Sequence, residues 1–153
     1  MNRIYCNLII GIISMTAVIN VHAGKKNYNK LFSHGKSSYD IIVSSTASPS
    51  EKTAAKELQD AIRNISGTTL PLVLDGRKRN KNHIYIGYQD LPAGKVGAKK
   101  PAFKEEGFIY RSVGKDLWIY GGAQRGTLYG VYAFLQKEMG CRWFTPNDSL
   151  IPQ

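Results

Sequence analysis

The stretch IIVSSTASPSEKTAAKELQDAIRNISG, at residues 41–67, decides the fold class. It opens with the β-branched run Ile41 to Val43, which is typical of a buried strand. Ser48 to Glu51 (SPSE) then matches a capping box with proline at the first helical position. Alanine, leucine and isoleucine follow at three- and four-residue spacing as far as a glycine stop at Gly67. A strand followed closely by an amphipathic helix predicts a helix that lies on a sheet.

The rest of the chain extends this unit with strands and one more helix. β-Branched and aromatic runs, tight glycine turns and a final apolar stripe at helical spacing predict strands at 70–74, 83–88, 107–113 and 115–120 and a helix at 124–139. Pro71 favours an edge position for its strand, and Gly114 predicts a tight hairpin. The order β-α-β-β-β-β-α predicts an α+β fold, a mixed sheet with two main helices packed on it.

Length and composition favour one small folded domain. The chain has 153 residues, with 21 Lys and Arg, 11 Asp and Glu and a net charge of +10. Arg3, an apolar stretch at 8–18 and a small residue at Ala23 are typical of a secretory signal at 1–23. We therefore expect cleavage near Ala23, a secreted or periplasmic protein and no permanent membrane anchor. A flexible leader at 24–39, a domain at 40–146 and a tail at 147–153 are expected to follow.

Few residues have a side chain and a spacing that suggest catalysis or metal binding. His34 and His83 stand far apart, with no cysteine or carboxylate at metal-ligand spacing, so we expect no metal site and no cofactor. Glu105 and Glu106 are adjacent, and neighbours entering a strand point to opposite faces, so no catalytic carboxylate pair is predicted. Basic residues at 77–81 and 95–104 fit solvated loops, and a secreted protein argues against a nucleic-acid partner. Cys141 has two interpretations, a reactive thiol or, the favoured one, a small buried side chain.

Several segments together resemble a known family. They are EGF at 106–108, LWIYG at 117–121, RGTLYGVYAFL at 125–135 and GCRWFTP at 140–146, with weaker likeness at 54–58, 65–67 and 84–87. They are similar to the N-terminal domain of bacterial α-glucuronidases of glycoside hydrolase family 67 and of related uncharacterised glycoside hydrolases, which share a fold like the second domain of hexosaminidases.

The resemblance implies a structural role for this chain. In such families the domain precedes a (β/α)₈ barrel that carries the acid and the base. The barrel is the expected partner, in cis in the relatives and in trans or missing here, because the sequence stops at Gln153. The resemblance assigns the turn between hairpin and last helix to Gly122, Arg125, Gly126, Tyr129 and Gly130. Arg142, Trp143 and Phe144 would lead toward the barrel, and we expect them to form an interface.

Two functions follow from these observations. The first is a non-catalytic accessory domain of a secreted glycoside hydrolase acting on plant or glucuronate-bearing polysaccharide such as xylan, and whether the chain is itself an enzyme stays open. The alternative is a self-standing carbohydrate-binding module that binds polysaccharide directly. Trp118 and Tyr120 share one face of their strand and would be its glycan contacts. Packing of these rings in the core is the competing explanation.

Overall fold

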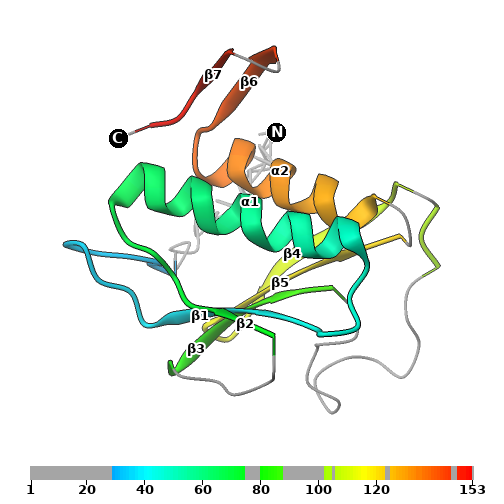
Figure 1. The fold of residues 1–153 in the computed structure, drawn as a ribbon, viewed down its shortest axis with the longest axis horizontal. Coiled ribbons are helices and arrows are strands. Elements are labelled where there is room, and N and C mark those ends of the chain that lie inside the picture. Colours follow the sequence, from blue (N-terminus) through cyan, green and yellow to red (C-terminus); the bar gives the residue numbers. More distant parts are fainter. Residues whose placement is uncertain are drawn as a thin grey trace, which may run out of the picture.

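The chain folds into a two-layer domain in which helices cover one face of a sheet (Figure 1). The computed structural model describes residues 29–74, 80–87, 102–104, 106–122, 125–145 and 148–152. Within this part the elements are β1 (Tyr39–Val43), α1 (Pro49–Ser66), β2 (Leu72–Val73), β3 (Asn82–Ile86), β4 (Phe108–Val113), β5 (Asp116–Gly121), α2 (Gly126–Glu138), β6 (Arg142–Thr145) and β7 (Asp148–Leu150).

The main sheet is mixed, as predicted. Its strand order is β2-β1-β3-β5-β4, with β1 parallel to β2 and β3, β3 parallel to β5, and β4 antiparallel to β5. Pro71 precedes the edge strand β2, where its carbonyl accepts the Ile41 N–H at 2.8 Å. Gly114 has φ +62° in the turn between β4 and β5, which a glycine adopts without strain. The predicted α+β class, with two helices on a mixed sheet, is confirmed.

Helix α1 begins and ends as its sequence indicates. The Ser48 Oγ accepts the Glu51 N–H at 3.2 Å, and the Glu51 carboxylate accepts the Ser48 N–H at 2.9 Å, which completes the capping box. Gly67 ends the helix with φ +69° in the left-handed region. The buried face of α1 consists of alanine, leucine and isoleucine side chains: Ala54, Ala55, Leu58, Ala61 and Ile62.

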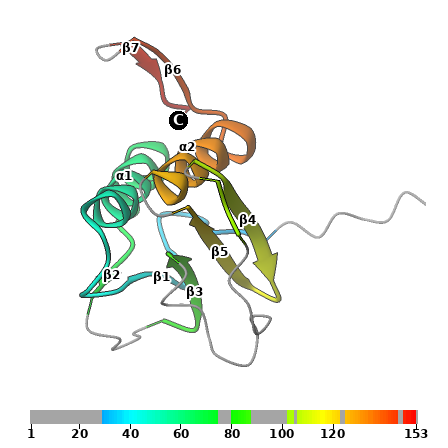
Figure 2. The ribbon, with the colours of Figure 1, turned by 90° about the vertical axis from the view of Figure 1, so that its right-hand side faces the viewer.

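Strand alternation divides the buried side chains into two cores. Ile84, Ile86, Leu117 and Ile119 belong to a large core beneath the helices, and Figure 2 shows both helices over this face. Tyr85, Trp118 and Tyr120 alternate with them and join a smaller core with Ile42 and Val73. The sheet is therefore apolar on both faces.

The boundaries of the domain differ from expectation at both ends. In the expected leader, Leu31 and Phe32 pack against the helix-side core, and Ser37 Oγ donates to the Leu31 carbonyl at 2.6 Å. Packed residues thus begin well before Asp40, because two apolar side chains without any periodicity suffice to anchor this segment. The expected tail contributes β7, which pairs with β6 in an antiparallel hairpin that the sequence did not predict.

Some expectations fall on other parts of the chain. The expected signal peptide and most of the two basic loops lie outside the described residues. None of the described helices is long and apolar enough to cross a membrane.

Candidate functional site

The turn between β5 and α2 is built on close backbone contacts. A Cβ atom on Gly126 would lie under 3.0 Å from the Gly107 carbonyl oxygen, and one on Gly121 would lie under 3.0 Å from the Gly126 backbone. Gly122 N–H donates to the Gly107 carbonyl at 2.7 Å, and Gly121 N–H donates to Thr127 Oγ1 at 3.1 Å. Glycines at these positions let strand, loop and helix meet without a side chain between them.

The other residues assigned to this turn lie at the start of α2. Arg125 is the N-cap residue, and its carbonyl accepts the Tyr129 N–H at 2.9 Å. A side-chain hydrogen bond with Tyr129 raises the pKa of the exposed Arg125 guanidinium. A Cβ on Gly130 would lie 3.0 Å from Ile119 Cγ2, so this glycine brings α2 close to the sheet. The structure therefore brings the five predicted residues together at one junction, with Gly107 and Gly121 added to them.

The proposed glycan contacts are buried. Trp118 is 0 % exposed and Tyr120 is 2 % exposed. Phe103 meets the Tyr120 ring edge-on at 5.9 Å between centroids, and the Arg111 guanidinium lies 5.1 Å from the centre of the Trp118 ring. The expectation that these two rings are open to a glycan is therefore wrong for this structure. Alternation places them on the face without helices, and these side chains cover that face instead.

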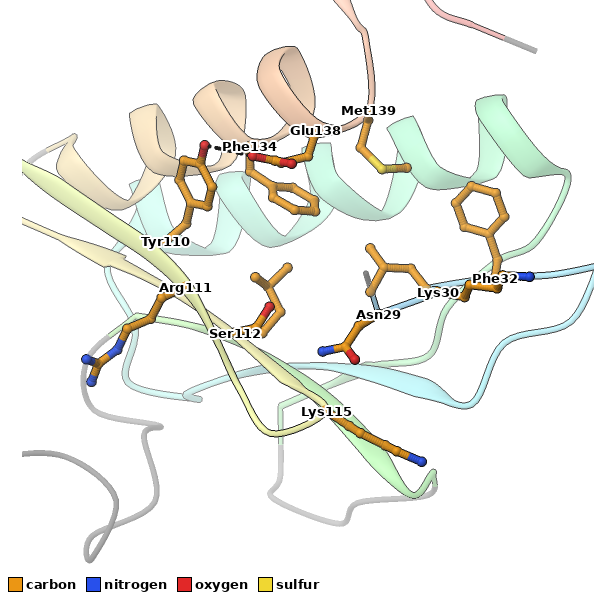
Figure 3. Close-up of a pocket in the computed structure, with 12 residues that line it drawn as sticks. Asn29, Lys30, Phe32, Tyr110, Arg111, Ser112, Lys115, Phe134, Glu138 and Met139 are labelled. Atoms are coloured by element: carbon orange, nitrogen blue, oxygen red, sulfur yellow. Dashed lines mark hydrogen bonds between the residues drawn. The ribbon is translucent and has the colours of Figure 1, made fainter. Parts of the chain in front are cut away.

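A pocket of about 430 Å³ lies at the opposite face, beside the end of α2 (Figure 3). Its walls come from the 29–32 segment, from β4 and β5 and from the last turns of α2. Asn29 Nδ2 donates to the Gly114 carbonyl at 2.9 Å and ties the segment to the hairpin turn. No local sequence pattern indicated this pocket, because residues 29 and 114 meet only in the folded chain.

The chemistry of the pocket centres on one carboxylate. The Tyr110 hydroxyl donates to Glu138 Oε1 at 3.2 Å, drawn as the dashed line in Figure 3. Burial raises the pKa of Tyr110, and the hydrogen bond and negative charge of Glu138 raise it further. Among the described residues that line the pocket, Glu138 is the one carboxylate, so they include no pair of carboxyl groups at the spacing that glycoside hydrolysis uses. No group of three His, Cys, Asp or Glu side chains in the described part is placed to hold a metal ion.

The β6–β7 hairpin carries exposed apolar side chains. Phe144 is 65 % exposed, Leu150 is 55 % exposed and Trp143 is 39 % exposed. The Trp143 ring meets the Tyr132 ring edge-on at 5.0 Å, and Arg142 Nη1 donates to the carbonyls of Gln136 at 2.7 Å and Cys141 at 2.8 Å. The sequence indicated Arg142, Trp143 and Phe144 of β6 as interface residues but not Leu150, which belongs to the unpredicted strand β7.

Cys141 lies where the domain body meets this hairpin. Its side chain is 0 % exposed, and burial raises the pKa of its thiol. Its N–H donates to the Leu135 carbonyl at 3.1 Å after Gly140 turns the chain with φ +78°. The interpretation of Cys141 as a small buried side chain is confirmed.

A protein family, a curated relative and a solved structure are each similar to part of this chain. The family described as Glycosyl hydrolase family 67 N-terminus matches residues 18–134. The Probable alpha-glucuronidase A of Neosartorya fischeri is 29 % identical over 100 residues, which are 64 % of this chain and 12 % of the relative. A solved GH138 enzyme targeting pectin rhamnogalacturonan II aligns with a TM-score of 0.44 and 15 % identity, over 73 % of this chain and 15 % of that chain.

These matches include most of this chain but only a small part of its curated relative. The chain spans 12 % of the length of the curated relative. The RGTLYG segment lies inside the family match, whereas the CRWF segment follows it. Since the match covers more than half of the sequence, this chain belongs to the glycosyl hydrolase family 67 N-terminus family.

Proposed function

We propose that this chain is the non-catalytic N-terminal accessory domain of a secreted glycoside hydrolase that acts on glucuronate-bearing polysaccharide such as xylan. The observation that carries the proposal is the family match over residues 18–134, which is to the N-terminus of family 67. The name of the curated relative, an α-glucuronidase, supplies the substrate class. Its far greater length supports a catalytic region as the partner of this domain.

The geometry of the pocket supports a non-catalytic role. Hydrolysis of a glycosidic bond by two carboxyl groups needs them roughly 5 to 9.5 Å apart across the substrate. Glu138 stands in the pocket with a phenol as its partner and is exposed. Among the described lining residues, Glu138 has no second carboxyl group to act with.

An activity assay tests this proposal. The purified 153-residue chain is incubated with glucuronic-acid-substituted xylo-oligosaccharides, and released glucuronic acid is measured against a family 67 α-glucuronidase as positive control. We expect no release by the chain alone. Release that disappears in Glu138→Gln and persists in Asp60→Asn, which changes a half-buried carboxylate on α1 that pairs with Lys56 and Arg63, would contradict the proposal and make the pocket an active site.

The carbohydrate-binding alternative needs exposed aromatic rings, and the two rings expected to bind glycan are buried. Its glycan contacts, Trp118 and Tyr120, lie in the smaller core. Binding of insoluble xylan by the chain alone would support the carbohydrate-binding alternative, and we expect no such binding.

Export of the protein is a separate part of the proposal. Cleavage near Ala23 predicts a mature chain that starts at Gly24. The intact mass of the protein recovered outside the cytoplasm checks the cleavage site, and a full-length mass in that fraction would contradict it.

A further inference from the structure

We propose that the β6–β7 hairpin is the docking element by which this domain binds the catalytic region of a glycoside hydrolase. The inference rests on the proposed function and adds to it the surface through which the two parts meet. It starts from the exposed apolar side chains of the hairpin, Trp143, Phe144 and Leu150.

These side chains are concentrated on one short element. Five large hydrophobic side chains are exposed in the described part of the chain, and three of them belong to the hairpin. Leu150 lies directly opposite Arg142 in the ladder. Exposed apolar area gathered beside a polar or charged group is typical of a protein interaction site.

The hairpin stands apart from the body of the domain. Figures 1 and 2 both place it beyond the helix layer, on the side away from the main sheet. In the described residues β6 pairs with β7 alone. An isolated two-stranded hairpin is at best marginally stable in water, so an element of this kind gains stability from a surface that covers it.

Two contacts nevertheless hold the hairpin in a fixed direction. Arg142 reaches back to the carbonyl of Gln136 in α2, and Trp143 packs its ring against Tyr132. The Tyr132 phenol is itself partly buried and interacts with Glu57 of α1, and both effects raise its pKa. A hairpin oriented in advance loses less conformational freedom on binding.

The size of the patch favours a tethered partner over a second copy of the chain. The three apolar side chains expose on the order of 300 Å². A stable interface between separate proteins buries about 800 Å² on each side. A small patch suffices when the partner is linked, because the linker supplies a high effective concentration. The hairpin begins at Arg142, shortly after the family-matched residues 18–134, and the part of the α-glucuronidase relative that aligns with this chain is 12 % of its length.

Site-specific photo-cross-linking in the native host tests the inference. Benzoylphenylalanine replaces Phe144 in the full chain or, as the matched control, Leu74, which is 48 % exposed and far from the hairpin in sequence. Cross-linked peptides are identified by mass spectrometry. We expect a glycoside hydrolase catalytic region, on the same chain or another, with a yield at least about tenfold above the Leu74 control. Leu150→Ser should lower that yield several-fold.

Three outcomes would overturn the inference. They are a Phe144 cross-link to a second copy of this domain, a cross-link to a protein of another class, and a yield no higher than that of the Leu74 control. The proposed function fails separately, through release of glucuronic acid by the chain alone. A cross-linked hydrolase that releases no glucuronic acid would leave the docking role intact and change the substrate class.

Discussion

The two tryptophans of this chain both lie in β-strands, and their surroundings are opposite. Trp118 in β5 is 0 % exposed, whereas Trp143 in β6 is 39 % exposed. Strand β5 has a neighbour on each side, and Arg111 lies over the Trp118 ring. Strand β6 has one partner, and Trp143 contacts Tyr132 of α2.

The difference shows that a strand pattern fixes direction but not burial. Alternation predicts which side chains share a face of the sheet. Whether that face is shielded from solvent depends on the number of neighbouring strands and on the side chains packed over it. The body of the domain provides that cover for Trp118 within one chain. The apolar side chains of the hairpin stay exposed within this domain and would be buried only by the proposed partner.

Removal of the buried ring should have the largest effect on stability. Trp118→Ala leaves a cavity in the smaller core and should lower the free energy of unfolding by about 3–5 kcal/mol. Trp143→Ala should cost only about 1 kcal/mol, the value of its edge-on contact with Tyr132. Urea denaturation followed by circular dichroism measures both. Similar losses in the two variants would mean that the rings are equally packed in solution.

Added bulk at the β5–α2 junction should come next. Gly126→Ala places a methyl group against the Gly107 backbone, which cannot move aside as a side chain can, and should cost about 1–3 kcal/mol. Gly130→Ala meets the Ile119 side chain at 3.0 Å and should cost less. Thermal unfolding of both variants checks the order. If Gly130→Ala were the more damaging, the close backbone approach would not be what limits this junction.

The local signals in the sequence predicted most of the body. The capping box at Ser48, the turn at Gly114 and the glycine stop at Gly67 each act over a few residues, so they can be read without knowing the fold. The five junction residues came from a family resemblance, and the structure gathers them at one turn. Gly107 was missed because it meets Gly126 only in the folded chain.

The remaining features depend on long-range contacts. Asp148 and Ser149 of β7 have low strand propensity, so their pairing with β6 had no local signal. The pocket wall at 29–32 lies in a polar, basic stretch, and its tie to Gly114 spans 85 residues of sequence. The Arg111 side chain likewise packs over the Trp118 ring, and alternation alone could not predict that this ring is shielded from solvent.

Loss of the α1 cap should have a smaller effect on the body. Ser48→Ala removes the acceptor for the Glu51 N–H and should cost about 1 kcal/mol. Ser50→Ala is the matched control, because the buried Ser50 Oγ has no hydrogen-bond partner in the described part of the chain. Its removal should cost nothing or stabilise slightly. Chemical denaturation of both variants tests the pair, and equal effects would argue against the capping box as a source of stability.

The smallest effect should come from the most exposed ring. Phe144→Ser in the chain alone removes a side chain that is 65 % exposed, so the free energy of unfolding should change by less than about 0.5 kcal/mol. Cys141 should stay protected from iodoacetamide at pH 8 in the variant, because its buried thiol keeps a raised pKa. The solubility of the chain should rise, since an apolar patch is reduced. A large loss of stability, or rapid labelling of Cys141, would show that the hairpin and the body fold as one unit and that Phe144 already has its partner within this domain.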